Sequence, residues 1–523
     1  MMSMTLDAAL LSVEQRRPSF LDTSDVSGGA SVGRNASSAA KHYAQLSKFR
    51  DPCTIEKLPD KVLMHIFSYL PHREICRNAR VCKKWRMIAY DSRLWKSVSL
   101  RPEISGLQVT SLENLLALLR QYIVRFGPSL QYIELPIELI THTVLHELAN
   151  KCPNLTSMLM DFSTAMQLHD FNELQAFPAK LNSLCICLSG VIFMEGFMRK
   201  IYNFINGLEV LHLIGTYERV EEEEEEIYEV VNIHKLKSAT PNLVVVNLYG
   251  INFLDDGHVE AFSSNCIQLE CMSAPYCGKV TGSCLKTLLN RCKRLQCLIL
   301  TQTSLKSEYV MNVEWDKTQL QELDITATDL SQECLIEILT KLKQLRYLSA
   351  GQQDSFNDKV LARFLEQGSP GKLVALDLDR CDNLSNEGLQ ALLGKYGSNL
   401  LGLILSGIPT ITDQLLISVM PQLRNLRILG VGTAEGCCPK VHTKVLVDQL
   451  VEAIANNCHK LERVEIRWDG DTLRHSDKSQ KAIDHLRTKA LRLKSLVLSE
   501  GKYFENVKAN FERADRPTVV RSN

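Results

Sequence analysis

The 523-residue sequence carries no net charge and has no long apolar run. Sixty Lys and Arg residues balance sixty Asp and Glu residues, so no overall field attracts nucleic acid or an anionic membrane. No apolar stretch approaches the ~20 residues that a membrane-spanning helix needs. We therefore expect neither a nucleic-acid-binding protein nor a membrane protein.

Motifs of the common enzyme classes are also missing. The sequence has no GxSxG, no P-loop, no HExxH and no GxGxxG between a strand and a helix. We therefore predict a protein without catalytic activity or a cofactor.

The seventeen cysteines do not have the spacing of a zinc site. They follow a repeat period rather than CxxC pairs, which argues against a metal. The short apolar stretch Ala8–Val13, flanked by Asp7 and Glu14, is not typical of a secretory signal. We expect reduced cysteines that fill the core, and a cytoplasmic or nuclear location.

The sequence is rich in leucine at a fixed period. The pattern LxxLxL, with other apolar residues allowed, occurs fourteen times, and successive copies mostly start 25 to 28 residues apart. The copies start at Leu130, Leu155, Leu181, Leu208, Leu243, Leu269, Leu295, Leu320, Leu345, Leu373, Leu400, Leu426, Leu461 and Leu493. This period is typical of leucine-rich repeats.

The second half of each repeat has the apolar spacing of a helix. Ser331 and Thr412 each precede such a stripe and are predicted helix N-caps. Cysteines before the strands, such as Cys152, Cys266 and Cys458, resemble those of the cysteine-containing leucine-rich repeats, in which the thiol fills a small interior site. The predicted fold class is α/β: a leucine-rich-repeat solenoid with a parallel concave sheet and convex helices.

A helical segment precedes the repeats. Leu63, Ile66, Phe67 and Leu70 form one apolar stripe, and Val81, Trp85 and Ile88 form a second. Three short helices in fewer than 40 residues cannot build a large core, so this segment is predicted to be a docking surface.

This segment resembles an F-box. The resemblance rests on Leu58-Pro59, the block Ile66–Leu70, the block Val81–Arg86 and the closing Leu94-Trp95. The family usually has an acidic residue two places after the proline, where this chain has Lys61. An F-box followed by leucine-rich repeats looks like the substrate-recognition subunit of an SCF-type cullin–RING ubiquitin ligase.

The resemblance implies a set of partners. The F-box would bind a Skp-family adaptor, and through it the cullin and RING subunits, and the repeats would hold a protein substrate for ubiquitination and proteasomal degradation. The implied adaptor-binding residues are Leu58, Pro59, Leu63, Ile66, Phe67, Leu70, Ile75, Val81 and Trp85. The alternative is a scaffold that binds partners without directing ubiquitin transfer, and a ligand-gated receptor ranks below both.

Substrate contacts are predicted on the concave sheet. In LxxLxLx the third, fifth and seventh residues point outward. We expect the C-terminal repeats and their loops to carry most of the contacts. The candidate residues are Tyr249, Asp324, Tyr347, Asp377, Asp379, Arg463, Arg467 and Trp468.

The predicted organisation has four parts. Residues 1–48 are a disordered tail rich in Ser, Gly and Ala, and residues 52–100 are the F-box. Residues 101–509 are the solenoid, with an acidic loop at 217–232 that contains six consecutive glutamates. Residues 510–523 are a polar tail.

Overall fold

The computed structural model describes residues 55–101, 111–189, 192–215, 229–432, 445–467, 473–474, 479–498, 502–512 and 518–522. The chain divides into two compact units, residues 1–89 and 90–523. The whole predicted disordered tail (residues 1–48), the acidic run Glu221–Glu226 and Trp468 lie outside the described residues.

The described part of the first unit, from residue 55 onward, consists of three short helices. These are α3 (Asp60–Phe67), α4 (His72–Asn78) and α5 (Lys83–Ala89), with a 3-10 turn over Ile55–Lys57. Pro59 and Pro71 occupy the N-cap positions of α3 and α4, where the missing proline N–H costs no helical hydrogen bond.

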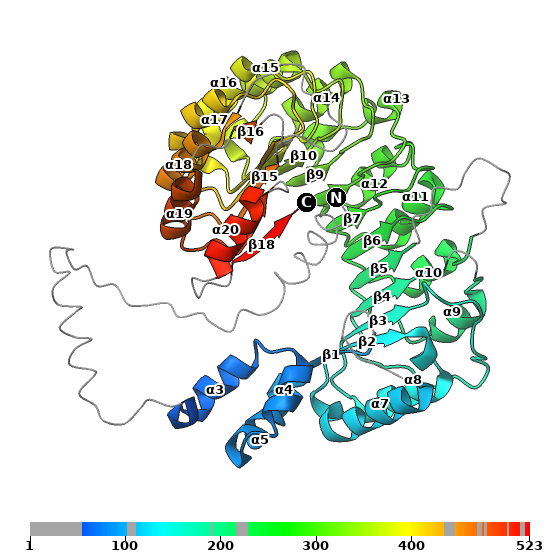
Figure 1. The fold of residues 1–523 in the computed structure, drawn as a ribbon. Helices are drawn as coiled ribbons and strands as arrows, with labels where there is room; N and C mark the ends of the chain where they lie inside the picture. Colours follow the sequence, from blue (N-terminus) through cyan, green and yellow to red (C-terminus); the bar gives the residue numbers. More distant parts are fainter. Residues whose placement is uncertain are drawn as a thin grey trace, which may run out of the picture. The chain divides into compact units, whose positions relative to one another are not determined.

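The second unit is built on one parallel sheet. Each strand pairs with the next along the chain, in the order β1 to β13, then β15, β17 and β18 (Figure 1). The strands are β1 (Ser97–Ser99), β2 (Tyr132–Pro136), β3 (Ser157–Asp161), β4 (Ser183–Cys187), β5 (Val210–Ile214), β6 (Val245–Tyr249), β7 (Cys271–Ser273), β8 (Cys297–Ile299), β9 (Glu322–Asp324), β10 (Tyr347–Ser349), β11 (Ala375–Asp377), β12 (Gly402–Ser406), β13 (Ile428–Gly432), β15 (Arg463–Arg467), β17 (Ser495–Leu498) and β18 (Val519–Ser522). All fourteen LxxLxL copies fall on strands β2 to β13, β15 and β17, which confirms the predicted solenoid.

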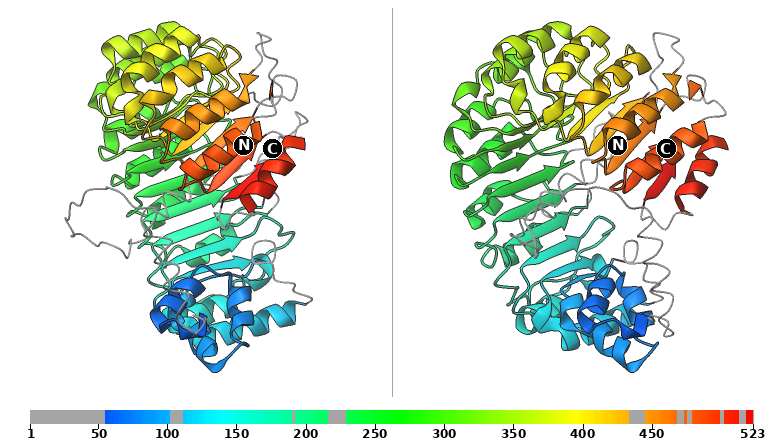
Figure 2. Two further views of the ribbon diagram at one scale, coloured as in Figure 1. Left: turned by 60° about the vertical axis from the view of Figure 1, so that its left-hand side comes forward. Right: turned by 90° about the vertical axis from the view of Figure 1, so that its left-hand side faces the viewer.

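The helices of this unit cover one face of the sheet and form the outer side of its curve (Figures 1 and 2). They are α7 (Leu112–Phe126), α8 (His142–Lys151), α9 (Glu195–Ile201), α10 (Ile233–Ala239), α11 (Asp256–Asn265), α12 (Leu285–Arg291), α13 (Ser307–Val310), α14 (Gln332–Lys341), α15 (Asp358–Gln367), α16 (Asn386–Tyr396), α17 (Asp413–Val419), α18 (Val447–Asn457), α19 (Ser479–Lys489) and α20 (Lys502–Glu512). In the part of the chain that the structure describes, no helix combines the length and apolar character needed to cross a bilayer.

The predicted N-caps are confirmed. The Ser331 hydroxyl accepts the Cys334 N–H at 3.3 Å, and the Thr412 hydroxyl accepts the Leu415 N–H at 3.2 Å. These bonds satisfy donors that the first helical turn leaves free.

The repeat cysteines are buried between neighbouring repeats, as predicted. The Cys266 thiol donates to the Thr240 carbonyl at 3.3 Å, and the Cys458 thiol to the Leu423 carbonyl at 3.4 Å. Burial raises the pKa of both thiols to about 12. Protonated, buried thiols are structural rather than reactive.

A left-handed residue after several strands extends the pairing between repeats. Tyr276, Gln302 and Arg380 have φ values of 61°, 52° and 54°. Their N–H groups each donate to a carbonyl of the next repeat at 2.8 Å. Such backbone is costly for residues with a Cβ, so the stacked neighbours hold it in place. No sequence signal marks these positions.

Two segments at the ends of the solenoid pack into the second unit. Trp95, which closes the F-box resemblance, stacks on Phe126 with ring centroids 4.7 Å apart, and its carbonyl accepts the Tyr122 hydroxyl. The predicted polar tail contains β18, which pairs with β17 and buries Val520. A short parallel pair, β14 (Val445–Leu446) and β16 (Leu473–Arg474), was also not predicted.

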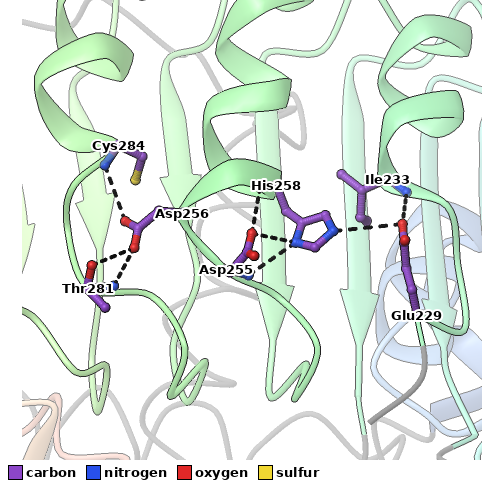
Figure 3. Close-up of polar contacts among 7 residues, drawn as sticks. All are labelled: Glu229, Ile233, Asp255, Asp256, His258, Thr281 and Cys284. Atoms are coloured by element: carbon purple, nitrogen blue, oxygen red, sulfur yellow. Dashed lines mark hydrogen bonds and ion pairs between the residues drawn. The ribbon is translucent and has the colours of Figure 1, made fainter. Parts of the chain in front are cut away.

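Asp256 joins two repeats at the start of α11 and α12 (Figure 3). Its carboxylate accepts the Thr281 N–H and hydroxyl at 2.8 and 2.7 Å, the Gly282 N–H at 2.9 Å and the Cys284 N–H at 3.2 Å. Burial alone would raise the pKa of this carboxyl, but the hydrogen bonds from Thr281 and Cys284 outweigh it and lower the pKa.

On the same helix, α11, the imidazole of His258 lies between two carboxylates (Figure 3). Its Nδ1 is 2.7 Å from Asp255 and its Nε2 is 3.8 Å from Glu229. Glu229 also accepts the N–H of Ile233 at 2.9 Å, at the start of α10. Side chains at this edge of the sheet therefore link successive helix N-termini.

We predict that Asp256→Asn destabilises the second unit by about 1–3 kcal/mol, because an amide has only one acceptor oxygen for four donors. Since the native pKa is lowered, this stabilisation is present above the ordinary Asp pKa and is lost as pH falls below it. Urea unfolding at pH 7 and hydrogen exchange at Thr281 and Cys284 measure it. Asp354→Asn, at an exposed position, is the control; equal effects of the two changes would contradict the role of Asp256.

Candidate functional site

The first unit has a small interior and an apolar outer surface. Of the implied adaptor-binding residues, Leu63, Phe67 and Ile75 are buried. Leu58, Ile66, Leu70 and Trp85 are half-buried, whereas Pro59 and Val81 are exposed. The buried side chains support the surface, so direct contact with a partner would fall to the accessible ones.

Helix α3 is apolar on two adjacent faces. Leu63 and Phe67 form the buried face, and the Phe67 ring lies edge-on to Trp85 with centroids 5.4 Å apart. Val62 and Ile66 lie one turn apart on α3, and Tyr69, in the turn that follows the helix, is 76% exposed. Ile66 was predicted from the sequence but Val62 and Tyr69 were not, although the spacing i, i+4 and i+7 is regular.

Other exposed apolar residues were also missed. Met87 on α5 is 77% exposed, and Ile55 lies exposed before α3. With Val62, Tyr69 and Val81 they give this small unit an apolar surface of the kind that marks a protein–protein contact.

At Lys61 the chain lacks the acidic residue that is usual in the F-box pattern, and the acidic residue before it, Asp60, forms an ion pair. The ammonium of Lys84 lies 3.3 Å from the Asp60 carboxylate and donates to the Leu58 carbonyl at 2.7 Å. Asp60, one position before Lys61, therefore connects α3 to α5 within the unit. Both groups are accessible to water, so the ion pair contributes little stability.

On the concave face of the sheet, the outward residues mostly alternate with buried leucines as predicted. Among the candidate substrate-binding residues whose side chains the structure describes, Tyr347 is the most accessible, at 38% exposure. Tyr249 is buried instead, with its ring 5.1 Å from that of Tyr276. It is therefore less suited to contact a partner than the sequence predicts.

At the N-terminal end of this face the charges are paired. Glu134 accepts the Ser99 hydroxyl at 2.7 Å and the Tyr132 hydroxyl at 2.6 Å. The guanidinium of Arg101 lies 2.8 Å from Asp161 and 4.0 Å from Glu134. Burial and the bond to Glu134 raise the pKa of Tyr132, so its phenol stays a donor.

In the centre of the face the structure brings together Asp324, Asp377 and Asp379. Asp324 accepts the Thr326 N–H at 2.9 Å, and Asp377 accepts the Asp379 N–H at 3.0 Å. Burial raises the pKa of Asp377 to about 7, and the neighbouring Asp379 and Asp324 charges add to the effect. Burial also raises the pKa of Asp324.

The Arg380 guanidinium borders this acidic centre, 3.9 Å from the Asp379 carboxylate.

At the C-terminal end Arg463 is already engaged. Its Nε and Nη2 lie 2.6 and 2.5 Å from one carboxylate oxygen of Glu465, which is buried. The backbone of Arg467 belongs to β15, but its side chain and all of Trp468 lie outside the described residues. Arg463 thus offers a partner less positive charge than the sequence alone predicts.

Known proteins are similar to parts of this chain. The family model described as F-box-like matches residues 55–101. F-box/LRR-repeat protein 12 from Homo sapiens is 33% identical over 118 residues, and the mouse protein (Mus musculus) is 33% identical over 112 residues. Each match covers 20% of this chain, and the chain spans about a third of the length of these curated relatives (33%).

A solved structure is also similar. A chain of the crystal structure of the Rad7 and Elc1 complex in yeast matches with a TM-score of 0.42 and 16% identity, covering 78% of this chain and 97% of that one. The chain therefore combines an F-box-like segment with a leucine-rich-repeat solenoid of strands and helices.

We predict that Asp377→Asn stabilises the protein at pH 8 by about 1–2 kcal/mol, after allowing for solvent around this half-buried group. Because the native pKa of Asp377 is raised to about 7, the ionised carboxyl costs stability above pH 7, and this cost disappears as pH falls toward 4. Urea unfolding at pH 8 and pH 4.5 should give a difference only at the higher pH. A difference that is the same at both would contradict the raised pKa.

Proposed function

We propose that this protein is the substrate-recognition subunit of an SCF-type ubiquitin ligase. The observation that carries the proposal is an F-box-like segment followed directly by a long leucine-rich-repeat solenoid. The first unit would bind a Skp-family adaptor, which joins it to cullin and RING subunits. The solenoid would hold a protein substrate. We propose a cytoplasmic or nuclear location for this assembly.

The chain would act by proximity rather than by chemistry. Holding a substrate near a charged ubiquitin-conjugating enzyme raises the effective concentration of its lysines, so transfer proceeds without a catalytic residue from this chain. The products would be ubiquitinated proteins destined for the proteasome. A rigid sheet with exposed polar and aromatic residues suits the binding role.

The adaptor would contact the accessible apolar residues of the first unit. Pro59 and Val81 are both exposed and within the F-box-like match. Exposed apolar anchors that become buried at an interface commonly dominate its binding energy. Leu63, Phe67 and Ile75 would act indirectly, by holding the helices in place.

We predict that Pro59→Ala/Val81→Asp weakens binding to a Skp-family adaptor at least tenfold, because it places a charge in an apolar contact. Glu74→Ala/Arg77→Ala, which removes an exposed ion pair from α4, is the matched control and should bind normally. Affinity purification of the full chain, probed for adaptor and cullin, measures the effect. Recovery of the adaptor without the cullin would instead indicate a scaffold, and equal recovery by both variants would contradict the proposed surface.

We predict that substrate binding depends on the middle of the concave face. Tyr347→Ala removes its accessible aromatic ring and should reduce recovery of substrates at least tenfold without affecting the adaptor. Arg463 is a poorer test, because its removal would leave Glu465 buried without its cation.

The measurement is quantitative mass spectrometry of proteins purified with each variant after proteasome inhibition. Ile267→Ala, an exposed apolar residue between α11 and β7, is the control. If Tyr347→Ala and Ile267→Ala recover the same proteins as the wild type, the substrates do not bind at this part of the sheet.

A further inference from the structure

Basic residues gather on one edge of the C-terminal half of the solenoid. Because all strands are parallel, the segments that connect each helix to the next strand lie along the same edge. Five such segments, each taken with any adjoining last residues of its helix, precede β10, β11, β12, β13 and β15: residues 340–346, 367–374, 395–401, 420–427 and 456–462. Together they contain eight Lys or Arg residues and one acidic residue, Glu462, which lies 2.8 Å from Lys494 and 3.8 Å from Arg427. These five strands are adjacent in the sheet.

One exposed cation from each segment forms what we call the basic edge. Its members are Lys343, Lys372, Lys395, Arg424 and Lys460. Their contacts are with uncharged groups: Lys343 with the Gln367 carbonyl at 2.8 Å, Lys372 with the Gln344 amide oxygen at 3.0 Å, Lys395 with the Tyr396 ring at 5.1 Å, Arg424 with the Pro421 carbonyl at 2.8 Å, and Lys460 with the Asn425 amide oxygen at 2.7 Å.

None of the five forms an ion pair with a carboxylate of the described residues. Other cations on this edge do: Lys341 pairs with Glu337, and Arg427 lies 3.8 Å from Glu462. The basic edge therefore carries positive charge that the chain itself does not neutralise in the part described.

Helix polarity alone does not account for this row. Helix C-termini lie at this edge in every repeat, and their partial negative charge favours nearby cations. The segments before β3, β6 and β7 (residues 151–156, 239–244 and 265–270) also follow helix C-termini. Together these three segments contain one Lys or Arg, which is Lys151. There Asn154 and Asn242 bond to carbonyls of the preceding repeat, at 2.7 and 2.9 Å. In these repeats, backbone carbonyls at this edge accept hydrogen bonds from asparagine rather than from Lys or Arg.

We propose that the basic edge is a binding surface for an acidic, extended segment of a partner protein. Neighbouring strands lie ~4.8 Å apart, so the five cations span about 20 Å, the length of roughly six residues of extended chain. A single row of cations can therefore contact the acidic side chains of one extended segment along its length. The basic edge shares no residue with the candidate concave-face contacts or with the F-box-like segment, so the proposal does not depend on the proposed ligase function.

The charges nearby favour a narrow polypeptide over a nucleic acid. The concave face of the same repeats carries Asp324, Asp377 and Asp379, which would repel the many phosphates of a duplex. The chain has no net positive charge to offset this repulsion.

The test uses a fluorescein-labelled peptide with eight consecutive glutamates, and a peptide with eight glutamines as its uncharged counterpart. Fluorescence anisotropy measures binding to the full chain at 50 and 300 mM salt. Wild type should bind the glutamate peptide at least tenfold more tightly than the glutamine peptide, and the preference should shrink at high salt.

The variant Lys343→Glu/Lys372→Glu/Lys460→Glu should lose about tenfold or more in affinity for the glutamate peptide. Lys279→Glu/Lys306→Glu/Lys359→Glu changes the net charge equally, at exposed positions beside the strand C-termini and helix N-termini, and should change the affinity less than twofold. Thermal unfolding checks that both variants remain folded.

Three outcomes would overturn the proposal. The first is a wild-type protein with no preference for the glutamate peptide. The second is an equal loss of affinity in the two triple variants, which would indicate a response to net charge alone. The third is tighter binding to a 20-base-pair duplex DNA than to the peptide, abolished by the basic-edge variant, which would assign the surface to nucleic acid. None of these outcomes bears on adaptor binding.

Discussion

The structure depends on the inability of a single repeat to bury its own apolar face. Each strand of the long sheet has only three to five residues. The leucines of successive repeats, such as Leu323 and Leu348, are buried because neighbouring repeats cover them. Hydrogen bonds also join successive repeats: left-handed residues donate to the next repeat, cysteine thiols donate to the preceding one, and Asp256 accepts from the next. A change at one of these contacts therefore affects two repeats.

Stacking also decides where charge can accumulate. The interior accepts leucine and protonated cysteine, so polar groups go to the concave face and to the two edges. On the concave face the carboxylates near Arg101 are compensated, and Glu465 is compensated by Arg463. At the acidic centre, burial raises the pKa of the Asp324 and Asp377 carboxyls. A neutral chain can thus present separate acidic and basic surfaces within the same repeats.

The first unit has a much smaller core than the solenoid. Its three helices enclose Leu63, Phe67 and Ile75, and little else is available to form a core. Val62 on α3 and Tyr69 in the turn after it then remain exposed. An apolar surface on so small a unit fits a role in binding another protein, which is what the F-box-like match implies.

The sequence by itself determined the solenoid, its fourteen leucine patterns, its helix N-caps and the structural role of its cysteines. These features arise from a short-range residue pattern that recurs in each repeat. Only the tertiary structure decided that Tyr249 and Phe67 are buried, that Arg463 is held by Glu465, that residues 519–522 complete the sheet, and that five cations from five repeats lie along one edge. Each of these facts depends on which side chains of other turns become neighbours, and a local pattern carries no information about its neighbours in space.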